Sequence, residues 1–558
     1  MSGTITPTAT DAPLQAGLLS SFFDEAAARF SNAPAIDFLG RHFSYREIAE
    51  LVDRAAVGLQ SLGVEKGTRV GLFLPNTPYS VIAFFAVLKV GGVVVNYNPL
   101  YAEPEVRHQV QDSGTRVMFV LDLADHYNKV AAQLGNGTLQ HIIVCPLGRA
   151  MPGLKGAAFT LLKRKTLIKA KPDAQNSVFA ALVAQGGSPK PVALDPSAPA
   201  VLQYTGGTTG VPKAAVLTHS NLTIQVQQLV RWIPEYTPGS ERVLGILPLF
   251  HVFAMTVVML VGIACGAEML LLPRLDLDML MKTVTRRRPT MAPGVPTLYT
   301  AIANAADKTK GVDLSSIRIC LSGGAPLPDE VRVRFEKLTG CVLVEGYGLS
   351  EASPVVTINP PGTAGKPGSV GLPVAGTVIE IRSIDDPNKL MPQGESGEVC
   401  IRGPQVMAGY WNRPDETARV MIDGALRTGD VGYIDADGYL FLVDRLKDLI
   451  ICSGFNVYPR TIEEALYRHP AVAEAAVIGI PDQYRGEAPK AFVQLRAGMT
   501  ATPEEIMTFL QGHISKIEIP REIEIRDSLP KSTVGKILRR SLADEEKQRA
   551  KAKAERAA

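Results

Sequence analysis

Short hydrophobic runs alternate with longer mixed segments along most of the chain. The runs at 70–74, 117–121 and 141–145 predict buried strands, because a short apolar stretch bounded by polar or turn residues suits a strand covered on both faces. Residues 79–90 predict a helix between two of these strands, and residues 317–322 predict a strand that ends at a Gly-Gly turn. This alternation is typical of an α/β fold, in which ligands bind at the carboxyl ends of the strands.

The pattern changes later in the chain, which indicates a division into domains. Residues 369–442 contain shorter runs and glycine turns, which predict a small β subdomain, while a helix at 461–468 and a strand at 475–480 predict a further unit. A chain of 558 residues is also too long for one hydrophobic core. We therefore expect an N-terminal domain over 1–444, with two βαβ-type subdomains and a β subdomain, and a small α+β C-terminal domain over 445–558.

One long apolar run, at 252–267, raises the question of a membrane span. It is shorter than the roughly 20 residues that a spanning helix needs. Gly262 and Gly266 also interrupt it. We therefore expect this run to form a helix buried in the core.

Composition and charge narrow the class of protein. A hydrophobic fraction of 46% and a charged fraction of 20% are those of a globular enzyme, and a net charge of +3 is too small to indicate nucleic-acid binding. The six cysteines have no paired spacing, which predicts a reducing compartment without a zinc site or a disulfide framework. The N-terminus has neither the basic start nor the apolar centre of a secretion signal, so we expect a cytoplasmic location.

Residues 154–171 contain many basic residues, no acidic ones, and large apolar residues between them. This composition fits a basic amphipathic patch for an anionic membrane surface, which would hold the protein on the inner face of the cell membrane. A solvated surface loop with a few buried leucines fits the same residues equally well, so both interpretations stay open. The basic residues are Lys155, Lys163, Arg164, Lys165, Lys169 and Lys171, and the apolar ones are Leu154, Phe159, Leu161, Leu162, Leu167 and Ile168.

The strongest chemical signal is Tyr-Thr-Gly-Gly-Thr-Thr-Gly-Val-Pro-Lys at 204–213. Glycines let backbone N–H groups approach a phosphate, threonine hydroxyls add hydrogen bonds or reach a metal ion, and Lys213 supplies a positive charge. A strand predicted at 199–204 precedes the loop, so the segment indicates a nucleotide-phosphate loop at the end of a strand. It is not a Walker loop, because Pro212 precedes the lysine and Ala214 follows it. The proline also disfavours a helix that starts directly after the loop.

Four further motifs follow the loop along the chain. They are Leu-Pro-Leu-Phe-His at 247–251, Glu-Gly-Tyr-Gly-Leu-Ser-Glu at 345–351, Arg-Thr-Gly-Asp at 427–430 with its continuation at 444–448, and Pro-Lys-Ser-Thr-Val-Gly-Lys at 530–536. With these motifs in this order, the chain resembles the adenylate-forming enzymes, a superfamily of acyl-CoA synthetases, luciferases and peptide-synthetase adenylation domains. The similarity is greatest to bacterial long-chain fatty acid–CoA ligases, through the strings at 403–411 and 453–459, and it departs from the usual pattern at Ala214, Ser350 and 514–520.

The resemblance implies two half-reactions. A carboxylate attacks the α-phosphate of ATP to give acyl-AMP and pyrophosphate, and the thiol of coenzyme A then attacks the acyl carbonyl and releases AMP. The implied catalytic residues are Lys536, which would contact the carboxylate and the bridging phosphate oxygen, Glu351, which would hold Mg²⁺ with Thr205, and Arg445. Asp430 would accept the ribose hydroxyls with Arg445 beside it, and a purely structural ion pair between these two is the alternative.

The resemblance also implies a binding set and a hinge. His251 would flank the acyl pocket without serving as a base, since a carboxylate is already ionised at neutral pH. Gly294 and Val295 resemble another pocket wall, where a glycine would leave room for a long chain. Lys447 would be the hinge about which a mobile C-terminal domain rotates between the half-reactions. The expected nucleotide-binding residues are Thr205, Gly206, Gly207, Thr208, Thr209, Gly210, Lys213, Gly323, Ala325, Gly346, Tyr347, Gly348, Ser350, Asp430 and Arg445.

Several functions remain open at this point. The acid could be long-chain, medium-chain or aryl, and a carrier protein could replace coenzyme A as the acceptor. A non-catalytic nucleotide- or lipid-binding protein is disfavoured because the charged residues of all the motifs are present, and a P-loop kinase is excluded by the missing Walker Lys-Ser/Thr pair. The expected ligands are ATP, Mg²⁺, a fatty acid and coenzyme A as co-substrate, without nucleic acid, and a homodimer is left open.

Overall fold

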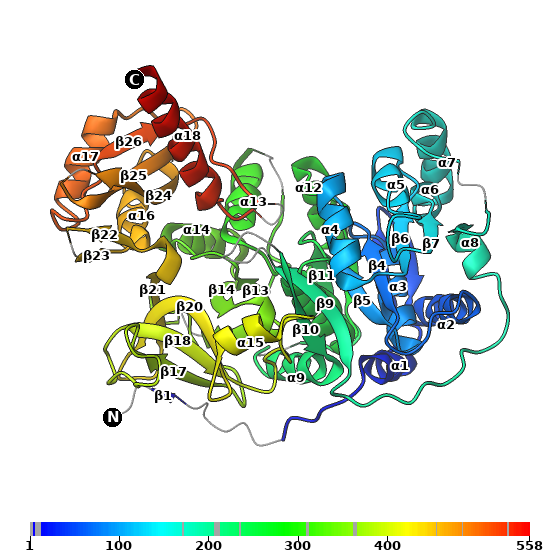
Figure 1. The fold of residues 1–558 in the computed structure, drawn as a ribbon. Helices are drawn as coiled ribbons and strands as arrows, with labels where there is room; N and C mark the ends of the chain where they lie inside the picture. Colours follow the sequence, from blue (N-terminus) through cyan, green and yellow to red (C-terminus); the bar gives the residue numbers. More distant parts are fainter. Residues whose placement is uncertain are drawn as a thin grey trace.

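A computed structural model describes residues 4–5, 13–169, 172–205, 212–233, 236–308, 312–360, 365–453, 455–482, 484–532 and 535–557. Helices and strands alternate along the chain as expected of an α/β protein, and the last part of the chain forms a lobe of its own (Figure 1). Part of the expected phosphate loop lies outside the described residues, namely Gly206, Gly207, Thr208, Thr209 and Gly210.

The first α/β unit is a seven-stranded sheet. Its paired strands run parallel except at one edge, where β9 and β10 are antiparallel. The strands predicted at 117–121 and 141–145 coincide with β6 and β7, and α3 lies where the sequence predicts a helix. The order across the sheet is β10 (Lys213–Thr218), β9 (Pro199–Thr205), β5 (Val93–Asn96), β4 (Arg69–Phe73), β6 (Val117–Leu121), β7 (His141–Cys145) and β8 (Asn176–Val178), with α2 (Tyr45–Ser61), α3 (Pro78–Lys89), α4 (Glu103–Ser113) and α5 (Ala124–Ala131) among its helices.

A second α/β unit consists of two four-stranded sheets, which isolated bridges through Met291 connect. The strand predicted at 317–322 is β13, and its parallel neighbour β14 ends in the Gly-Tyr-Gly motif. The carboxyl ends of these two strands therefore meet at one edge, the place where open α/β sheets bind ligands. The strands are β11 (Arg242–Gly245), β12 (Glu268–Leu271), β2 (Pro34–Phe38) and β3 (Arg41–Ser44), then β13 (Ile319–Ser322), β14 (Val342–Gly348), β15 (Val355–Ile358) and β16 (Leu372–Pro373), and the helices include α12 (Leu277–Arg287), α13 (Pro296–Lys308) and α14 (Asp329–Thr339).

The apolar run at 252–267 is buried, as predicted, but it is not one regular helix. A π-helical turn, η1 (Met255–Leu260), lies between α10 (Val252–Ala254) and α11 (Val261–Ala264). The helix ends before Gly266, whose φ of +65° lets the chain turn into β12. In the part of the chain that the structure describes, no helix has both the length and the apolar character needed to cross a membrane.

The region predicted to be a β subdomain is a six-stranded, largely antiparallel sheet. Its last strand ends at Arg445 and leads into the short turn η3 (Leu446–Asp448), which carries the expected hinge residue. The strands are β1 (Thr4–Ile5), β17 (Val378–Arg382), β18 (Gly397–Arg402), β20 (Ala425–Ile434), β19 (Met421–Ile422) and β21 (Leu440–Arg445).

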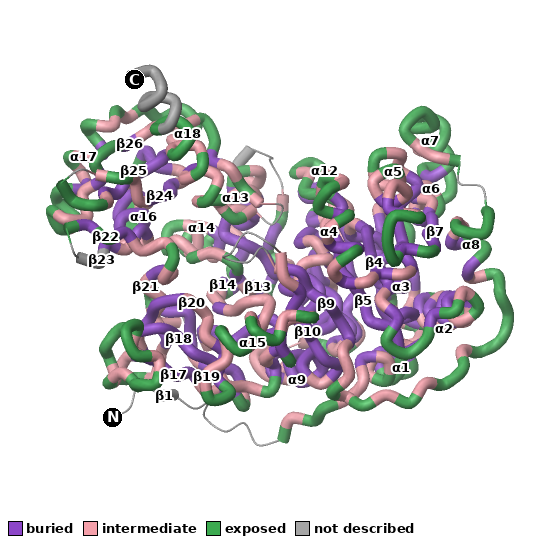
Figure 2. Tube along the Cα trace, in the orientation of Figure 1, coloured by how far each residue is buried: buried purple, intermediate pink, exposed green. Residues whose placement is uncertain are grey.

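After this turn the chain forms a five-stranded sheet with a hydrophobic core of its own, which includes Leu466, Val477 and Val493 (Figure 2). The helix and strand predicted at 461–468 and 475–480 are α16 and part of β24. The elements are β22 (Ile450–Cys452), β23 (Phe455–Val457), β24 (Val472–Asp482), β25 (Gly486–Leu495) and β26 (Glu522–Ile525), with α16 (Pro459–Tyr467), α17 (Pro503–Gln511) and α18 (Arg539–Ala557).

Candidate active site

Residues from two motifs meet at the carboxylate of Asp430. The antiparallel register of β20 and β21 places Arg445 opposite Asp430, and Arg445 Nε lies 3.0 Å from Asp430 Oδ1. Tyr347, at the end of β14, donates its hydroxyl proton to Asp430 Oδ2 at 2.6 Å. The ion pair considered as a structural alternative is therefore present. It also leaves the side chain of Arg445 40% exposed, so the guanidinium is free to donate to a ligand as well.

A second carboxylate, that of Glu351, belongs to the expected metal site. Ser350 begins the short turn η2 (Ser350–Ala352), and this turn carries Glu351. Thr205 donates its hydroxyl to Glu351 Oε1 at 3.4 Å, and Tyr410 donates to the same oxygen at 2.9 Å. A carboxylate with a neighbouring hydroxyl is a set of hard oxygen donors, which fits the preference of Mg²⁺.

The expected phosphate lysine, Lys213, already has an anionic partner. Its Nζ lies 2.6 Å from Glu416 Oε2 and 5.5 Å from the centre of the Tyr410 ring. Lys213 is paired with Thr205 in the antiparallel register of β9 and β10, so the loop between these strands begins and ends at neighbouring residues. A strand follows the loop, in agreement with the proline that disfavours a helix there.

Tyr410 and Glu416 are site residues that the sequence reasoning missed. Tyr410 stands in the string at 403–411 that carries part of the family resemblance, which is the signal that could have found it. Glu416 lies in α15 (Pro414–Val420) and offers no motif of its own. Only the packing of α15 beside β10 brings its carboxylate to Lys213.

The glycines of the site permit close backbone approach. Gly323 follows β13, where its N–H donates to Gly294 O at 3.1 Å, and a Cβ on it would lie 3.6 Å from Gly346 O. At Gly348 a Cβ would lie 2.0 Å from Pro354 O, so no other residue fits without backbone movement. Ala325, two residues beyond Gly323, is partly exposed at the same strand end.

Gly294 differs from its expected role. The space that a Cβ would occupy is already filled by Leu298 Cδ2 and Tyr299 Cζ, each at 3.0 Å. The missing side chain lets α13 pack closely and does not open room for an acyl chain at that point. Val295, the next residue, is buried, and its side chain lies close to Gly535.

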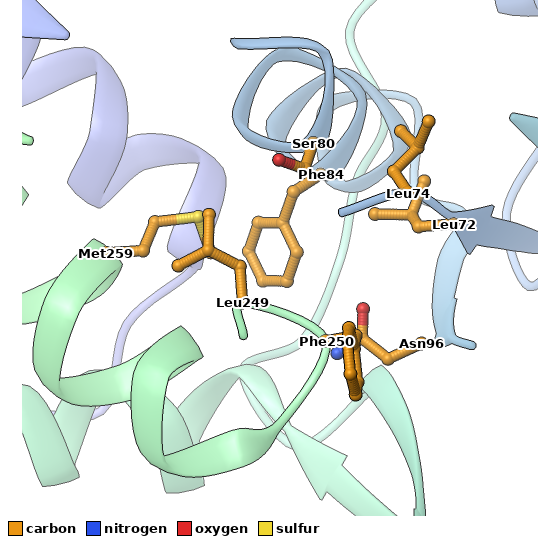
Figure 3. Close-up of a pocket in the computed structure, with 8 residues that line it drawn as sticks. All are labelled: Leu72, Leu74, Ser80, Phe84, Asn96, Leu249, Phe250 and Met259. Atoms are coloured by element: carbon orange, nitrogen blue, oxygen red, sulfur yellow. The ribbon is translucent and has the colours of Figure 1, made fainter. Parts of the chain in front are cut away.

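His251 marks the edge of the expected acyl pocket. Its Nδ1 accepts the N–H of Phe253 at 3.3 Å, and burial together with the charge of Lys536 lowers the pKa of His251 to about 4. The imidazole is therefore neutral near pH 7. The preceding residue, Phe250, lines a mainly apolar pocket with Phe84 and Met259 (Figure 3). Its volume of about 10 Å³ holds no more than a water molecule, so a chain could enter only if these side chains moved.

Lys536 joins the groups described above. Burial is the main cause that lowers its pKa to about 8, and the positive charge of Arg445 lowers it further, while Asp430 opposes the shift. The lysine therefore lies within electrostatic reach of the Asp430–Arg445 pair as well as of His251. Its loop is held against the second α/β unit, because Thr297 Oγ1 donates to Gly535 O at 3.4 Å.

The expected hinge residue, Lys447, occupies the turn η3 between β21 and the C-terminal sheet. Burial lowers its pKa, whereas the neighbouring Asp448 raises it. The position links the sheet that carries Asp430 to the part of the chain that carries Lys536. Rotation at this point would therefore move the lysine relative to the rest of the site.

Two family models match most of the chain. A family model described as AMP-binding enzyme matches residues 23–411, and one described as AMP-binding enzyme C-terminal domain matches residues 461–536. The chain belongs to the family of AMP-binding enzymes, whose members form adenylates.

Individual relatives cover almost all of the chain. It is similar to the long-chain-fatty-acid–CoA ligase of Bacillus subtilis (strain 168), at 43% identity over 96% of this chain and 95% of that protein. The long-chain-fatty-acid–CoA ligase of Yersinia pestis is 41% identical over 95% and 94% of the two chains. Among solved structures, ATP-bound MatB from Rhodopseudomonas palustris has a TM-score of 0.82 at 27% identity, covering 94% of this chain and 98% of that one.

The lowered pKa of Lys536 predicts the pH dependence of adenylate formation. If the lysine must be protonated to stabilise the phosphate charge, kcat/KM should fall about tenfold per pH unit above pH 8, because this parameter follows the ionisation of the free enzyme. Pyrophosphate release, measured from pH 6.5 to 10, tests this. Lys536→Arg should remove the decline, since arginine stays protonated, and Lys536→Ala should lower the rate by about 100-fold or more. A flat parent profile up to pH 10 would contradict the assignment.

Proposed function

We propose that this protein is a long-chain fatty acid–CoA ligase, which activates a fatty acid with ATP to acyl-AMP and pyrophosphate and then transfers the acyl group to coenzyme A. The observation that carries the proposal is the meeting of Lys536, Asp430, Arg445 and His251 at one place, although they come from three motifs. The relatives from Bacillus subtilis and Yersinia pestis are named for this activity, and each matches nearly the whole chain.

The residues divide the work of adenylation by charge. Asp430 accepts the ribose hydroxyls of ATP, and Tyr347 supports it from the opposite oxygen. Lys213 and the adjoining loop bind phosphate oxygens, for which Lys213 must exchange its contact with Glu416. Lys536 and Arg445 place positive charge where it develops on the carboxylate and the α-phosphate.

Mg²⁺ would be held by Glu351 and Thr205, and when bound it would neutralise phosphate charge. The hydrogen bond from Tyr410 fixes the carboxylate of Glu351 in the direction of Thr205. The hydroxyl oxygen of Thr205, which makes only a long contact with Glu351, would be available as the second ligand.

The proposal divides the chain into a nucleotide- and acid-binding domain at 1–444 and a mobile domain at 445–558. Two features support this division. The final sheet has its own hydrophobic core, and the turn that contains Lys447 links it to β21. Rotation at this turn would take Lys536 out of the site after adenylation and make way for the thiol.

A panel of acids tests the proposed function. AMP formation by the purified protein with ATP and Mg²⁺ should be fastest with palmitate and oleate, slower with octanoate, and near background with acetate and 4-coumarate, and it should require coenzyme A. A maximum at octanoate or 4-coumarate would instead assign a medium-chain or aryl acid. Acyl-AMP that accumulates without use of coenzyme A would indicate transfer to a carrier protein.

The substitution Lys447→Pro tests the hinge. Proline fixes φ and removes a donor, so the variant should slow thioester formation from supplied palmitoyl-adenylate by about tenfold or more while adenylation changes less. Each half-reaction is measured separately, by pyrophosphate release and by palmitoyl-CoA formation. An equal loss in both would contradict the hinge role.

A finer proposal concerns the location of the enzyme, on the inner face of the cytoplasmic membrane. The helix α7 (Gly153–Leu162) presents Leu154, Leu161 and Leu162 to solvent with 91%, 68% and 80% of each residue exposed. Lys163, Arg164 and Lys165 follow directly and are exposed as well. Exposed leucines beside several cations and no anion are suited to an anionic bilayer, from which a long-chain acid could also be drawn.

Vesicle binding tests this location. The triple substitution of Leu154, Leu161 and Leu162 by Gln should reduce sedimentation with phosphatidylglycerol vesicles by about fivefold or more, while activity on octanoate without vesicles stays unchanged. Leu100→Gln is a matched control, because Leu100 is 70% exposed in another loop. Equal binding by the parent protein and the triple variant would contradict the membrane location and would indicate that the segment is a solvated surface. Whether the protein forms a homodimer stays open, and light scattering would test it.

A further inference from the structure

Arg539, which follows Lys536 at the start of α18, brings one positive charge among three carboxylates. Its Nε donates to Glu463 Oε1 at 3.0 Å, Nη2 donates to the other oxygen of Glu463, and Nη1 donates to Asp448 Oδ2 at 3.2 Å. Asp444 Oδ1 lies 3.7 Å from the same Nη1. Asp444 is only 2% exposed and Arg539 26%, so water and salt screen these pairs less than they screen surface pairs.

The three carboxylates lie on two sides of the hinge. Glu463 and Asp448 follow Lys447 in the chain, so they would travel with Arg539 in a rotation. Glu463 is further anchored inside the C-terminal part, because its Oε1 accepts the N–H of Val477 at 2.8 Å. These two carboxylates therefore hold Arg539 in place within its own part of the protein.

Asp444 precedes the hinge and belongs to β21. Its Oδ2 accepts the backbone N–H of Arg460 at 2.8 Å, at the amino end of α16, where the helix dipole also favours a negative charge. Asp444 therefore contacts the C-terminal part at two points, the guanidinium of Arg539 and the first turn of α16. Both contacts would break if that part rotated about Lys447.

Hydrogen bonds among the described residues from Pro530 to Arg539 couple Arg539 to Lys536. Ser532 N–H donates to Lys536 O at 2.7 Å, and Lys536 N–H donates to Ser532 Oγ at 3.2 Å. Leu538 N–H donates to Pro530 O at 2.8 Å. In this segment, Gly535 contacts Thr297, and Arg539 contacts Asp444.

We propose that Asp444 and Arg539 form a latch across the hinge, which holds the C-terminal part in the orientation in which Lys536 reaches the Asp430–Arg445 pair. Arg539 is then a positioning residue for adenylation, and the latch must open before the thioester step. The inference rests on the proposed function, because that function gives Lys536 its role in the first step.

The test compares the two half-reactions in Arg539→Gln, Asp444→Asn and the double variant. Pyrophosphate release with palmitate, ATP and Mg²⁺ measures adenylation, and palmitoyl-CoA formation from supplied palmitoyl-adenylate measures the second step. Each single variant should slow adenylation about tenfold and change the second step less than about twofold. The double variant should be no more than about twofold slower than the slower single variant, because both substitutions remove one interaction.

Two features of the design exclude a purely structural effect. Arg539→Gln leaves Glu463 and Asp448 without their partner and could unfold the C-terminal part, whereas Asp444→Asn leaves that internal cluster intact. Arg540→Gln is the matched control, since Arg540 is 69% exposed and its carboxylate partner, Asp544, is 3.9 Å away on the same helix. This control should keep both half-reactions within about twofold of the parent.

Limited trypsin digestion without substrates provides a readout that does not depend on activity. An open latch should make cleavage after Lys447 about fivefold faster in Asp444→Asn and leave it unchanged in Arg540→Gln. Equal loss of both half-reactions, or parent-like adenylation and cleavage in Asp444→Asn, would overturn the latch. A parent that forms no acyl-AMP would contradict the proposed function instead, and the digestion would still decide whether the latch exists.

Discussion

The ion pair between Asp430 and Arg445 is the interaction on which the site depends. It closes the end of the β20–β21 hairpin and, through Tyr347, connects this hairpin to the second α/β unit. Because β21 ends at Arg445, the same pair also fixes where the chain enters the hinge turn. One buried carboxylate therefore sets the positions of the nucleotide site and of the C-terminal part together.

The site concentrates positive charge around that pair. Lys536 and Arg445 lie near one another, and the positive charge of Arg445 is among the causes that lower the pKa of Lys536, because bringing two cations together has an electrostatic cost. An anionic ligand would remove this cost, because phosphate and carboxylate oxygens would pair with both groups. The charges of Lys536 and Arg445 therefore favour an anion where the motifs meet, which matches the phosphates of ATP and the carboxylate of a fatty acid.

Apolar packing supplies the rigidity that such charges need. The run around η1 is buried, the side chains of Leu298 and Tyr299 pack closely against Gly294, and the backbone of Pro354 packs closely against Gly348. The pocket beside Phe250 has a volume of about 10 Å³, so a chain that entered it would have to move side chains.

The sequence by itself determined the elements and the residue types of the site. The runs that became β6 and β7 are strands because of their own apolar continuity, and the motif residues carry their chemistry wherever the chain places them. Tertiary structure alone decided which of them meet. The contacts of Tyr410 with Glu351, Glu416 with Lys213 and Arg539 with Asp444 join residues distant in the chain, and Gly294 is filled by neighbours that no local pattern reveals. Local periodicity records burial, whereas a pairing between distant side chains depends on how whole sheets and helices pack.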